Sequence, residues 1–303
     1  MITVIGEALV DLVIQPDGTV DAKLGGAPFN TARACGRLGA PVRFVGAVSV
    51  DRFGTMLADQ LVADGVDTSA IARVAVPTTL AAAELDGAGA ATYRFYICGT
   101  SAPMLATVPA AAPGELVFAG GLGLVLEPMA GVVEAALCDR AAGTLVMVDV
   151  NCRPSIVVDR GEYVARVGRV VSRADIVKVS DEDLAYISPG AAPIDAARSM
   201  LEQGASAVLL TRGGEGASVL TRGRETVVPA DVVDVVDTIG AGDSFGAGFL
   251  SWWVASGLGP GDAGDHRSLV EAVRAATQVA GVVVGRRGAD PPWRSELPPD
   301  WLP

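Results

Sequence analysis

Short apolar runs alternate along the chain with segments whose apolar residues recur at helical spacing. The helix expected at 29–38 has Pro28 near its start and Gly39 after its end, the usual boundary signals. Runs that are apolar throughout are typical of parallel strands covered by helices on both faces. The pattern predicts an α/β fold with a doubly wound, mostly parallel sheet. Strands are expected at 1–5, 43–47, 116–119, 145–150, 176–179 and 207–211, and helices at 29–38, 53–63, 128–142, 164–172 and 194–202.

Two segments depart from this alternation. Residues 9–20 have an extended pattern with a turn at Pro16 to Gly18, and residues 76–100 contain two strand-like runs around Asp86 to Gly89. We expect the two segments to form a small antiparallel sheet that acts as a lid, because ligands bind beyond the carboxyl ends of parallel strands. An edge hairpin without motion is the alternative. No repeat or low-complexity block divides the chain, so residues 1–303 are expected to form one domain with the lid inserted.

Charge and composition exclude several classes of protein. The chain has 35 acidic and 23 basic residues and a net charge of −12, which disfavours binding to nucleic acid or to an anionic membrane. The first residues lack a basic segment, and Glu7 and Asp11 interrupt their apolar run, unlike a signal peptide. The uncharged run between Glu115 and Glu127 is too short to span a bilayer. We therefore expect a soluble, cytoplasmic protein.

Other residues argue against common catalytic sites. The four cysteines, Cys35, Cys98, Cys138 and Cys152, form no CxxC pair and are expected to be free thiols. The single histidine, His266, is expected at the surface or in a helix cap, which excludes most His-based catalysis. The chain has no GxxxxGK[ST] loop. Its GxGxxG segment at 259–264 follows an expected helix rather than a strand, which argues against a dinucleotide-dependent oxidoreductase.

Residues 237–243, with the sequence DTIGAGD, form the strongest candidate site. Gly240, Ala241 and Gly242 are small enough for backbone amides to approach an anion, and the residues after them are expected to form a helix. Free amides at a helix N-terminus bind anions. Asp243 would lie in the first turn, where its carboxylate could accept a proton from an attacking hydroxyl group, although an Asp at a helix start is often only a cap.

Three further places have side chains suited to a polar ligand. Gly25 and Gly26 precede a second expected helix, and Asn30 in its first turns offers both a donor and an acceptor to vicinal hydroxyl groups. Asp11 is a polar residue between apolar neighbours. Asn151 and Arg153 follow an expected strand end, and an arginine there could bind a carboxylate or a phosphoryl group through two hydrogen bonds. Turns, caps and surface ion pairs are the alternative interpretations of these residues.

Taken together, these motifs resemble those of the ribokinase-like (PfkB) carbohydrate kinase family, in the family's order and over essentially the whole chain. The matching segments are GEALVD (6–11), GGAPFNTA (25–32), VGAVSVDRFG (45–54), DVNCRP (149–154), KVSDEDL (178–184), TRGGEGA (211–217), DTIGAGDSFGAGF (237–249) and GRRGADPP (285–292). The DTxGAGD pattern is the most diagnostic of them.

The resemblance implies a Rossmann-like domain with a β-sheet lid, and transfer of the γ-phosphoryl group of ATP to a sugar hydroxyl with Mg²⁺. It implies that Asp243 is the catalytic base and that Gly240, Ala241 and Gly242 form the anion hole. It further implies that sugar hydroxyls are held by Asp11, Gly25, Gly26 and Asn30, and that the nucleotide is bordered by Ser180, Thr211, Gly213, Gly216 and Thr277. Asp237 would help to hold a monovalent cation such as K⁺, as in several members of the family.

One segment departs from the family pattern. Members often have Asn-x-x-Glu near the metal and phosphates, whereas this chain has Ser180 and Asp183 at the two ends of that motif. Asp183 keeps a carboxylate that could serve Mg²⁺, and the serine resembles fructokinase-like members.

The sequence leaves the sugar open. Fructose is favoured by the resemblance of KVSDEDL and GGAPFN to fructokinase-like members, whereas Arg153 would suit the carboxylate of 2-keto-3-deoxygluconate. Ribose or a nucleoside would also suit a kinase of this family, and a non-catalytic sugar-binding module would keep the same fold without the reaction. Lid sheets of this family sometimes pair, so a homodimer through the lid is also possible.

Overall fold

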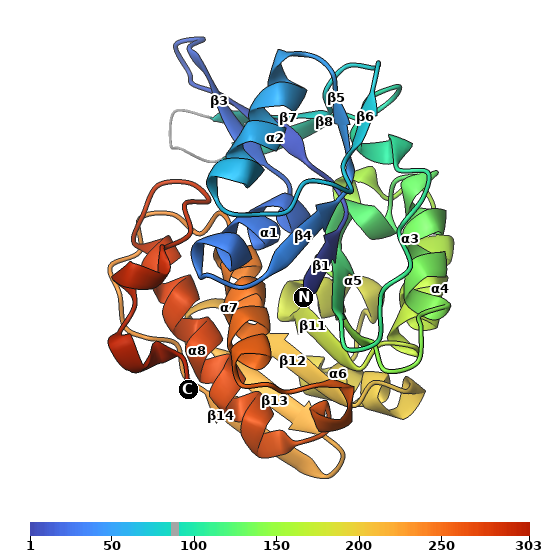
Figure 1. The fold of residues 1–303 in the computed structure, drawn as a ribbon, viewed down its shortest axis with the longest axis vertical. Coiled ribbons are helices and arrows are strands. Elements are labelled where there is room, and N and C mark those ends of the chain that lie inside the picture. The colour runs from blue at the N-terminus through green and yellow to red at the C-terminus, as the bar shows by residue number, and fades with distance from the viewer. Residues whose placement is uncertain (86–90) are drawn as a thin grey trace.

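The computed structural model describes residues 1–85 and 91–303, and these form a central sheet of eight strands with two smaller sheets beside it (Figure 1). The central strand order is β14-β13-β12-β11-β10-β9-β1-β4. Neighbours from β12 to β4 are parallel, and β13 and β14 complete one edge in antiparallel pairing. The strands are β1 (Ile2–Ile5), β4 (Val42–Val45), β9 (Leu116–Gly120), β10 (Leu145–Asp149), β11 (Ile176–Ser180), β12 (Ala207–Thr211), β13 (Ala217–Thr221) and β14 (Arg224–Val228).

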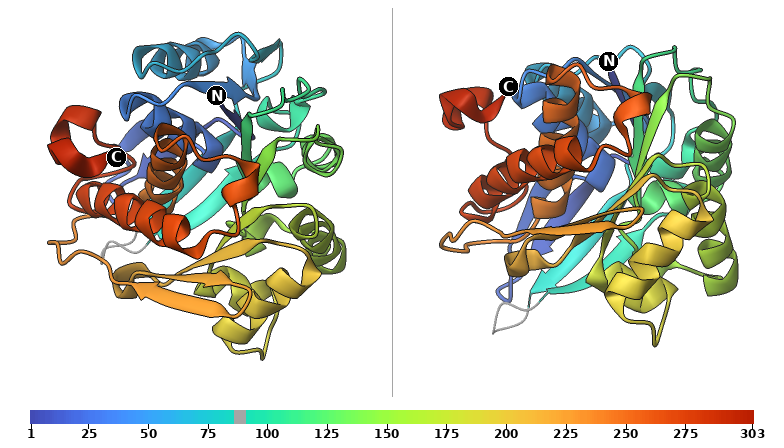
Figure 2. Two further views of the ribbon diagram at one scale, coloured as in Figure 1. Left: turned by 60° about the horizontal axis from the view of Figure 1, so that its bottom comes forward. Right: turned by 90° about the horizontal axis from the view of Figure 1, so that it is seen from below.

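Helices cover both faces of this sheet (Figure 2). Successive side chains of a strand point to opposite faces. Leu116 and Phe118 therefore enter a core layer with α1, α2, α7 and α8, whereas Val117 and Ala119 enter a second layer with α3, α4, α5 and α6. The helices are α1 (Ala27–Arg37), α2 (Arg52–Ala63), α3 (Met129–Cys138), α4 (Arg160–Val171), α5 (Asp181–Ile187), α6 (Pro193–Gln203), α7 (Ala241–Ala255) and α8 (His266–Val284).

A four-stranded sheet, at the top of Figure 1, extends beyond one end of the central sheet. Its strands are β2 (Leu9–Ile14), β3 (Val20–Gly25), β7 (Leu80–Leu85) and β8 (Ala91–Tyr96), in the order β3-β2-β7-β8. The expected second sheet is confirmed, but it is not purely antiparallel, because β2 pairs with β7 in parallel. Parallel strands need a long crossover, and here α1 and α2 lie in that crossover. The turn expected at 86–89 lies outside the described residues.

Some predicted boundaries also differ from those observed. The strand expected at 43–47 divides at Gly46, where a Cβ would lie only 2.6 Å from the Gly6 carbonyl oxygen. The chain leaves the central sheet there and forms a two-stranded sheet from β5 (Ala47–Ser49) and β6 (Ala72–Val74). The helix expected to reach residue 142 ends at Cys138. Short 3-10 turns occur at Ala102–Met104, Gly121–Leu124, Pro154–Ile156, Gly213–Glu215, Pro260–Asp262, Arg294–Glu296 and Pro299–Trp301.

The structure bears on two expectations from the sequence, the state of the cysteines and the lack of a membrane-spanning segment. The four cysteines are free thiols, as expected. Within 1–85 and 91–303, none of the helices combines the length and the apolar character needed to cross a membrane.

Candidate active site

The N-terminus of α7 forms the centre of the site. Gly240 is the N-cap with a φ of 78°, and a Cβ there would lie 2.6 Å from the Ala289 side chain, so glycine is required. The Ala241 amide donates to the Thr238 carbonyl at 3.2 Å. Among the described residues, the amides of Gly240 and Gly242 have no acceptor. Two of the three amides assigned to the anion hole are therefore available, and the helix dipole favours an anion beside them.

Asp243 is in the first turn of α7, as expected, and its side chain points toward α1. Its Oδ2 accepts a hydrogen bond of 2.9 Å from Asn30 Nδ2, across 213 positions of sequence. Only 9% of Asp243 is exposed. Burial raises its pKa to about 6, against the smaller lowering effect of the Asn30 hydrogen bond. A carboxylate with this pKa is ionised at pH 7 and is a better proton acceptor than an exposed Asp.

The sugar-binding candidates Asp11, Gly25, Gly26 and Asn30 gather around β2, β3 and α1. Gly25 pairs with Leu9 in the small sheet, and a Cβ on Gly25 would lie 2.2 Å from Asp11 Oδ2. The glycine therefore leaves room for the Asp11 carboxylate, whose pKa burial raises to about 6. Gly26 has a φ of 107° and is the N-cap of α1. Asn30 Oδ1 is buried without a hydrogen-bond partner in the described structure, so it remains free to accept one.

Arg153 follows β10 and faces the same acidic groups. Its positive charge lowers the pKa values of Asp11 and Asp243 against the larger effect of their burial. Its Nη1 donates to Asn151 Oδ1 at 2.5 Å and to the Cys152 carbonyl at 2.9 Å. Asn151 has a φ of 36°, unusual for a residue other than glycine. The structure thus shows Asn151 holding Arg153, a contact that the prediction of a sugar-binding Asn151 did not include.

Three buried ionisable residues in this region were not among the predicted site residues. Lys178 Nζ lies 2.7 Å from Asp149 Oδ2, and these two residues are 5% and 3% exposed. Glu7 follows β1 and accepts the Ala27 amide at 3.2 Å, while its other carboxyl oxygen is buried without a partner in the described part of the chain. Burial raises the pKa of Glu7 to about 8. A charged residue within or directly after an apolar strand was the sequence signal that could have identified these residues as part of the site.

The nucleotide candidates lie at the ends of two adjacent strands, β11 and β12. Ser180 ends β11, Thr211 ends β12, and these two residues are partners in the parallel ladder. Gly213 and Gly216 form the turn after β12, with φ values of 48° and 92°. Thr277 is on α8, where its hydroxyl donates to the Val273 carbonyl at 2.8 Å. Four of the five candidates are therefore neighbours, and the role of Thr277 stays a prediction.

The two predicted cation ligands already accept hydrogen bonds. Asp183 Oδ1 accepts the Cys152 amide at 2.6 Å, and its Oδ2 accepts the Ser180 amide and hydroxyl at 2.9 and 2.7 Å. Asp237 accepts the Ile239 amide at 3.0 Å and the Gly288 amide at 2.8 Å. In the described chain, no three Asp, Glu, His or Cys side chains are grouped as a metal site. These residues do not fit a protein-built Mg²⁺ cage.

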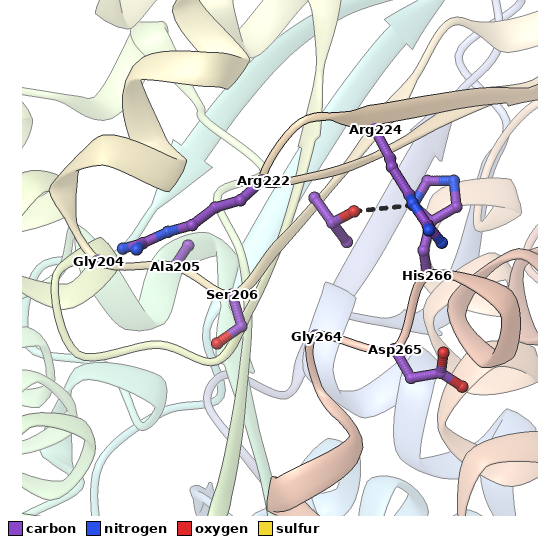
Figure 3. A pocket seen from close by; sticks show the side chains of 9 residues that line it. Gly204, Ala205, Ser206, Arg222, Arg224, Gly264, Asp265 and His266 are labelled. Atoms are coloured by element: carbon purple, nitrogen blue, oxygen red, sulfur yellow. Dashed lines mark hydrogen bonds between the residues drawn. The ribbon is translucent and has the colours of Figure 1, made fainter.

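A surface pocket shown in Figure 3 lies at the other end of the central strands, where residues just before β12 and at the end of β13 line it. His266 lines it as the first helical residue of α8, directly after the N-cap Asp265, and it is partly buried rather than the exposed or capping residue that the sequence predicted. Its Nδ1 and Nε2 lie 2.9 Å from Thr221 Oγ1 and 2.8 Å from Thr226 Oγ1. Both ring nitrogens are thus engaged, and the pocket is separate from the strand ends that hold the candidate site.

Comparison with known proteins agrees with this geometry. The family model "pfkB family carbohydrate kinase" matches residues 1–296. A fructokinase of Rhizobium leguminosarum bv. trifolii is 39% identical over 83% of this chain and 79% of its own, and one of Klebsiella pneumoniae is 32% identical over 85% of each.

Solved structures give the same result. A fructokinase of Vibrio cholerae O395, in a form with bound fructose, ADP and calcium ion, superposes with a TM-score of 0.85 and 25% identity, over 95% of this chain and 94% of its own. A Xylella fastidiosa fructokinase with bound ATP gives a TM-score of 0.85 and 29% identity, over 98% and 94%. The motifs, the fold and the sequence match agree: this chain belongs to the pfkB family of carbohydrate kinases and is an ATP-dependent sugar kinase.

Proposed function

We propose that the sugar phosphorylated by this kinase is fructose, and that Asp243 is the catalytic base. The curated relatives named above are fructokinases, and the Vibrio cholerae neighbour binds fructose and ADP. The observation that carries the catalytic assignment is the contact between Asn30 and Asp243, which brings a sugar-binding candidate to the carboxylate at the anion loop.

The reaction is a direct transfer between two oxygens. A fructose hydroxyl oxygen forms a bond to the γ-phosphorus of ATP, and the bond from that phosphorus to the bridging oxygen breaks, so that ADP leaves with the electron pair. Asp243 accepts the hydroxyl proton. The amides of Gly240 and Gly242 would stabilise the negative charge on the transferring group. Asp11, Gly25, Gly26 and Asn30 would orient the sugar.

The order of the strands suggests where each substrate binds. Ser180 and Thr211 end β11 and β12, whereas the sugar candidates lie beyond β1, on the far side of β10 and β9. The anion loop of α7 adjoins both regions, because Asp243 contacts Asn30 on α1 and a Cβ on Gly242 would lie 3.4 Å from Lys178 Nζ on β11. We therefore assign Ser180, Thr211, Gly213, Gly216 and Thr277 to ATP.

Mg²⁺ enters this proposal together with the nucleotide. Mg²⁺ is usually held by substrate phosphates, water and one or two carboxylates, so an ion carried by ATP agrees with a site that lacks its own cage. In that case Asp183 would keep the loop after β10 in place through the Cys152 amide. Asp237 would connect the residues before the anion loop to Gly288, near which K⁺ could bind.

The small sheet would act as the lid in a single kinase domain. Asp11 lies on β2, so movement of this sheet would bring a sugar-binding carboxylate over the substrate. Val20, Tyr93 and Tyr96 of the sheet are each exposed by 44% or more, which is compatible with pairing of two lids in a homodimer.

A sugar acid is the second candidate, and Arg153 is the reason. Its guanidinium acts electrostatically on both Asp11 and Asp243, so it could meet a substrate carboxylate between them. A nucleoside is also represented among the neighbours, since an aminoimidazole riboside kinase of Salmonella enterica superposes with a TM-score of 0.83 at 26% identity.

ADP release measured with ATP and a panel of sugars tests the proposal. Fructose should give the highest kcat/KM, above 2-keto-3-deoxygluconate, ribose and nucleosides. Asp243→Asn tests the assignment of the catalytic base. It should lower kcat at least ~100-fold while fructose and ATP still bind. Preference for another sugar would contradict the fructose assignment. Thermal stabilisation by fructose without any ADP release would instead indicate a non-catalytic sugar-binding module.

A further inference from the structure

Lys178 is a buried cation that the transfer step above does not use. It is 5% exposed, and both of its neighbours in β11, Val177 and Val179, are buried apolar residues. Its ladder partner on β10 is Asp149, with which it forms the ion pair of 2.7 Å. Desolvation largely offsets the attraction in such a pair, so a buried ion pair is weak evidence for a role in stability. Its position in the site is more informative.

The ammonium group lies at the start of α7. Ile176, two residues before Lys178, packs in the core layer with α1, α7 and α8, and alternate side chains share a face of the sheet. Lys178 Nζ is 3.4 Å from the point that a Cβ of Gly242 would occupy. The cation is therefore next to an anion-loop glycine whose amide has no acceptor among residues 1–85 and 91–303.

The ammonium group also has hydrogen-bonding capacity left for a ligand. It has three N–H donors, and Asp149 Oδ2 is its hydrogen-bond partner in the described chain. Asp149 Oδ1 is buried without a hydrogen-bond partner there. The bond between Lys178 and Asp149 Oδ2 is therefore what holds the two charged groups in place. Both members of the pair act on Asp243: Asp149 raises the pKa of that carboxyl and Lys178 lowers it, and the effect of Asp149 is the larger of the two.

We propose that Lys178 supplies a fixed positive charge beneath the anion loop, which stabilises the transferring phosphoryl group, and that Asp149 is the positioning residue that holds its ammonium group there. This inference rests on the proposed phosphoryl transfer. Amides at a helix N-terminus supply only partial charges, whereas a lysine supplies a full one. A cation already in place needs no reorganisation as negative charge develops.

The double variant Asp149→Asn/Lys178→Met tests the proposal, because it removes both charges and leaves no lone buried ion. Loss of a preorganised charge at a reacting group should lower kcat by roughly 10²-fold, while the KM values for fructose and ATP stay close to those of the wild type. The matched control is Arg140→Met/Asp175→Asn. It removes the ion pair between Arg140 and Asp175, the residue directly before the start of β11. It should retain the wild-type kcat.

A second measurement does not depend on turnover. Aluminium fluoride with ADP and fructose imitates a phosphoryl group in transfer, and it should raise the melting temperature of the wild type beyond the effect of ADP and fructose alone. The double variant should keep the effect of ADP and fructose and lose the increment from aluminium fluoride. A merely structural ion pair would leave that increment unchanged.

The outcomes separate the two proposals. An inactive wild type would overturn the proposed function, whereas an active wild type with an equally active double variant would overturn the role of Lys178 alone. If the double variant does not fold, Lys178→Arg replaces it. This variant keeps a positive charge but displaces it, so it should fold and lose part of both kcat and the aluminium fluoride increment. Wild-type values for both would contradict the proposal.

Discussion

Asp243→Asn should make the protein more stable at pH 7 while removing most of its turnover. Burial raises the pKa of Asp243 from an ordinary value of 3.8 to about 6. The folded protein therefore holds this proton more tightly than the unfolded chain. It loses stability as the pH rises from about 4 to about 6, and the loss persists at pH 7. An asparagine is neutral throughout and can still accept the Asn30 hydrogen bond.

The size of the effect follows from the two pKa values. A tenfold change in a proton equilibrium corresponds to about 1.36 kcal/mol, so ionised Asp243 costs the folded protein about 3 kcal/mol at pH 7. Solvent screens this charge little, because Asp243 is only 9% exposed. With an unfolding entropy of about 2.1 cal/mol/K per residue, this corresponds to a rise of about 5 °C in melting temperature.

Calorimetry of the two proteins at pH 7 and at pH 4 measures the effect, and ADP release measures the loss of turnover. The stabilisation should be present at pH 7 and nearly absent at pH 4, where the wild-type carboxyl is protonated. In the wild type, kcat/KM for fructose should fall about tenfold per pH unit below about 6, as the base of the free enzyme becomes protonated. A variant with equal or lower stability at pH 7, or a flat acid limb of kcat/KM, would refute the reasoning.

Three further predictions concern the residues around the sugar. Asp11→Ala should raise the KM for fructose by roughly 10–100-fold, the usual effect of losing a hydrogen bond to a charged group, while an unchanged KM for ATP shows that the rest of the site is intact. Glu7→Gln should reduce the fall in melting temperature between pH 4.5 and 8, because the folded protein keeps the Glu7 proton up to a pKa of about 8 whereas the unfolded chain loses it near 4.5; identical curves would contradict this. Gly26→Ala should destabilise the protein by about 1–3 kcal/mol in denaturant titrations, given its φ of 107° and a Cβ position 2.8 Å from the Glu7 carbonyl oxygen; Gly18→Ala, at an open turn, is its control and should cost less.

The parallel part of the fold was predictable because its strands are almost wholly apolar. The strand expected at 207–211 is observed with the same bounds, and β1, β9, β10 and β11 differ by one residue at an end. The two antiparallel strands β13 and β14 were missed. Ser218 and Thr221 interrupt the apolar pattern of β13, and most of β14 is exposed, so neither has the long apolar run that marks a buried strand.

The site was predictable where a short motif contains both a backbone feature and a reactive side chain. Gly240 and Asp243 are such a case, since a positive φ and a first-turn carboxylate belong to one helix start. Lys178 could not be placed in this way, because its partners lie on β10 and α7 and come from distant parts of the chain. The parallel pairing of β2 and β7 was missed for the same reason, since it depends on a crossover of 65 residues between Ile14 and Leu80.

The contact between Asn30 and Asp243 joins an early part of the polypeptide to a late one in the order of synthesis. The sugar-binding candidates on β2, β3 and α1 leave the ribosome early, whereas the base follows 213 positions later, with α7. A nascent or prematurely terminated chain that stops before residue 240 would therefore lack the proposed proton acceptor for the sugar hydroxyl. Enzymatic activity in a translation reaction should then appear only with chains long enough to include α7, which makes turnover a report that synthesis has passed this helix.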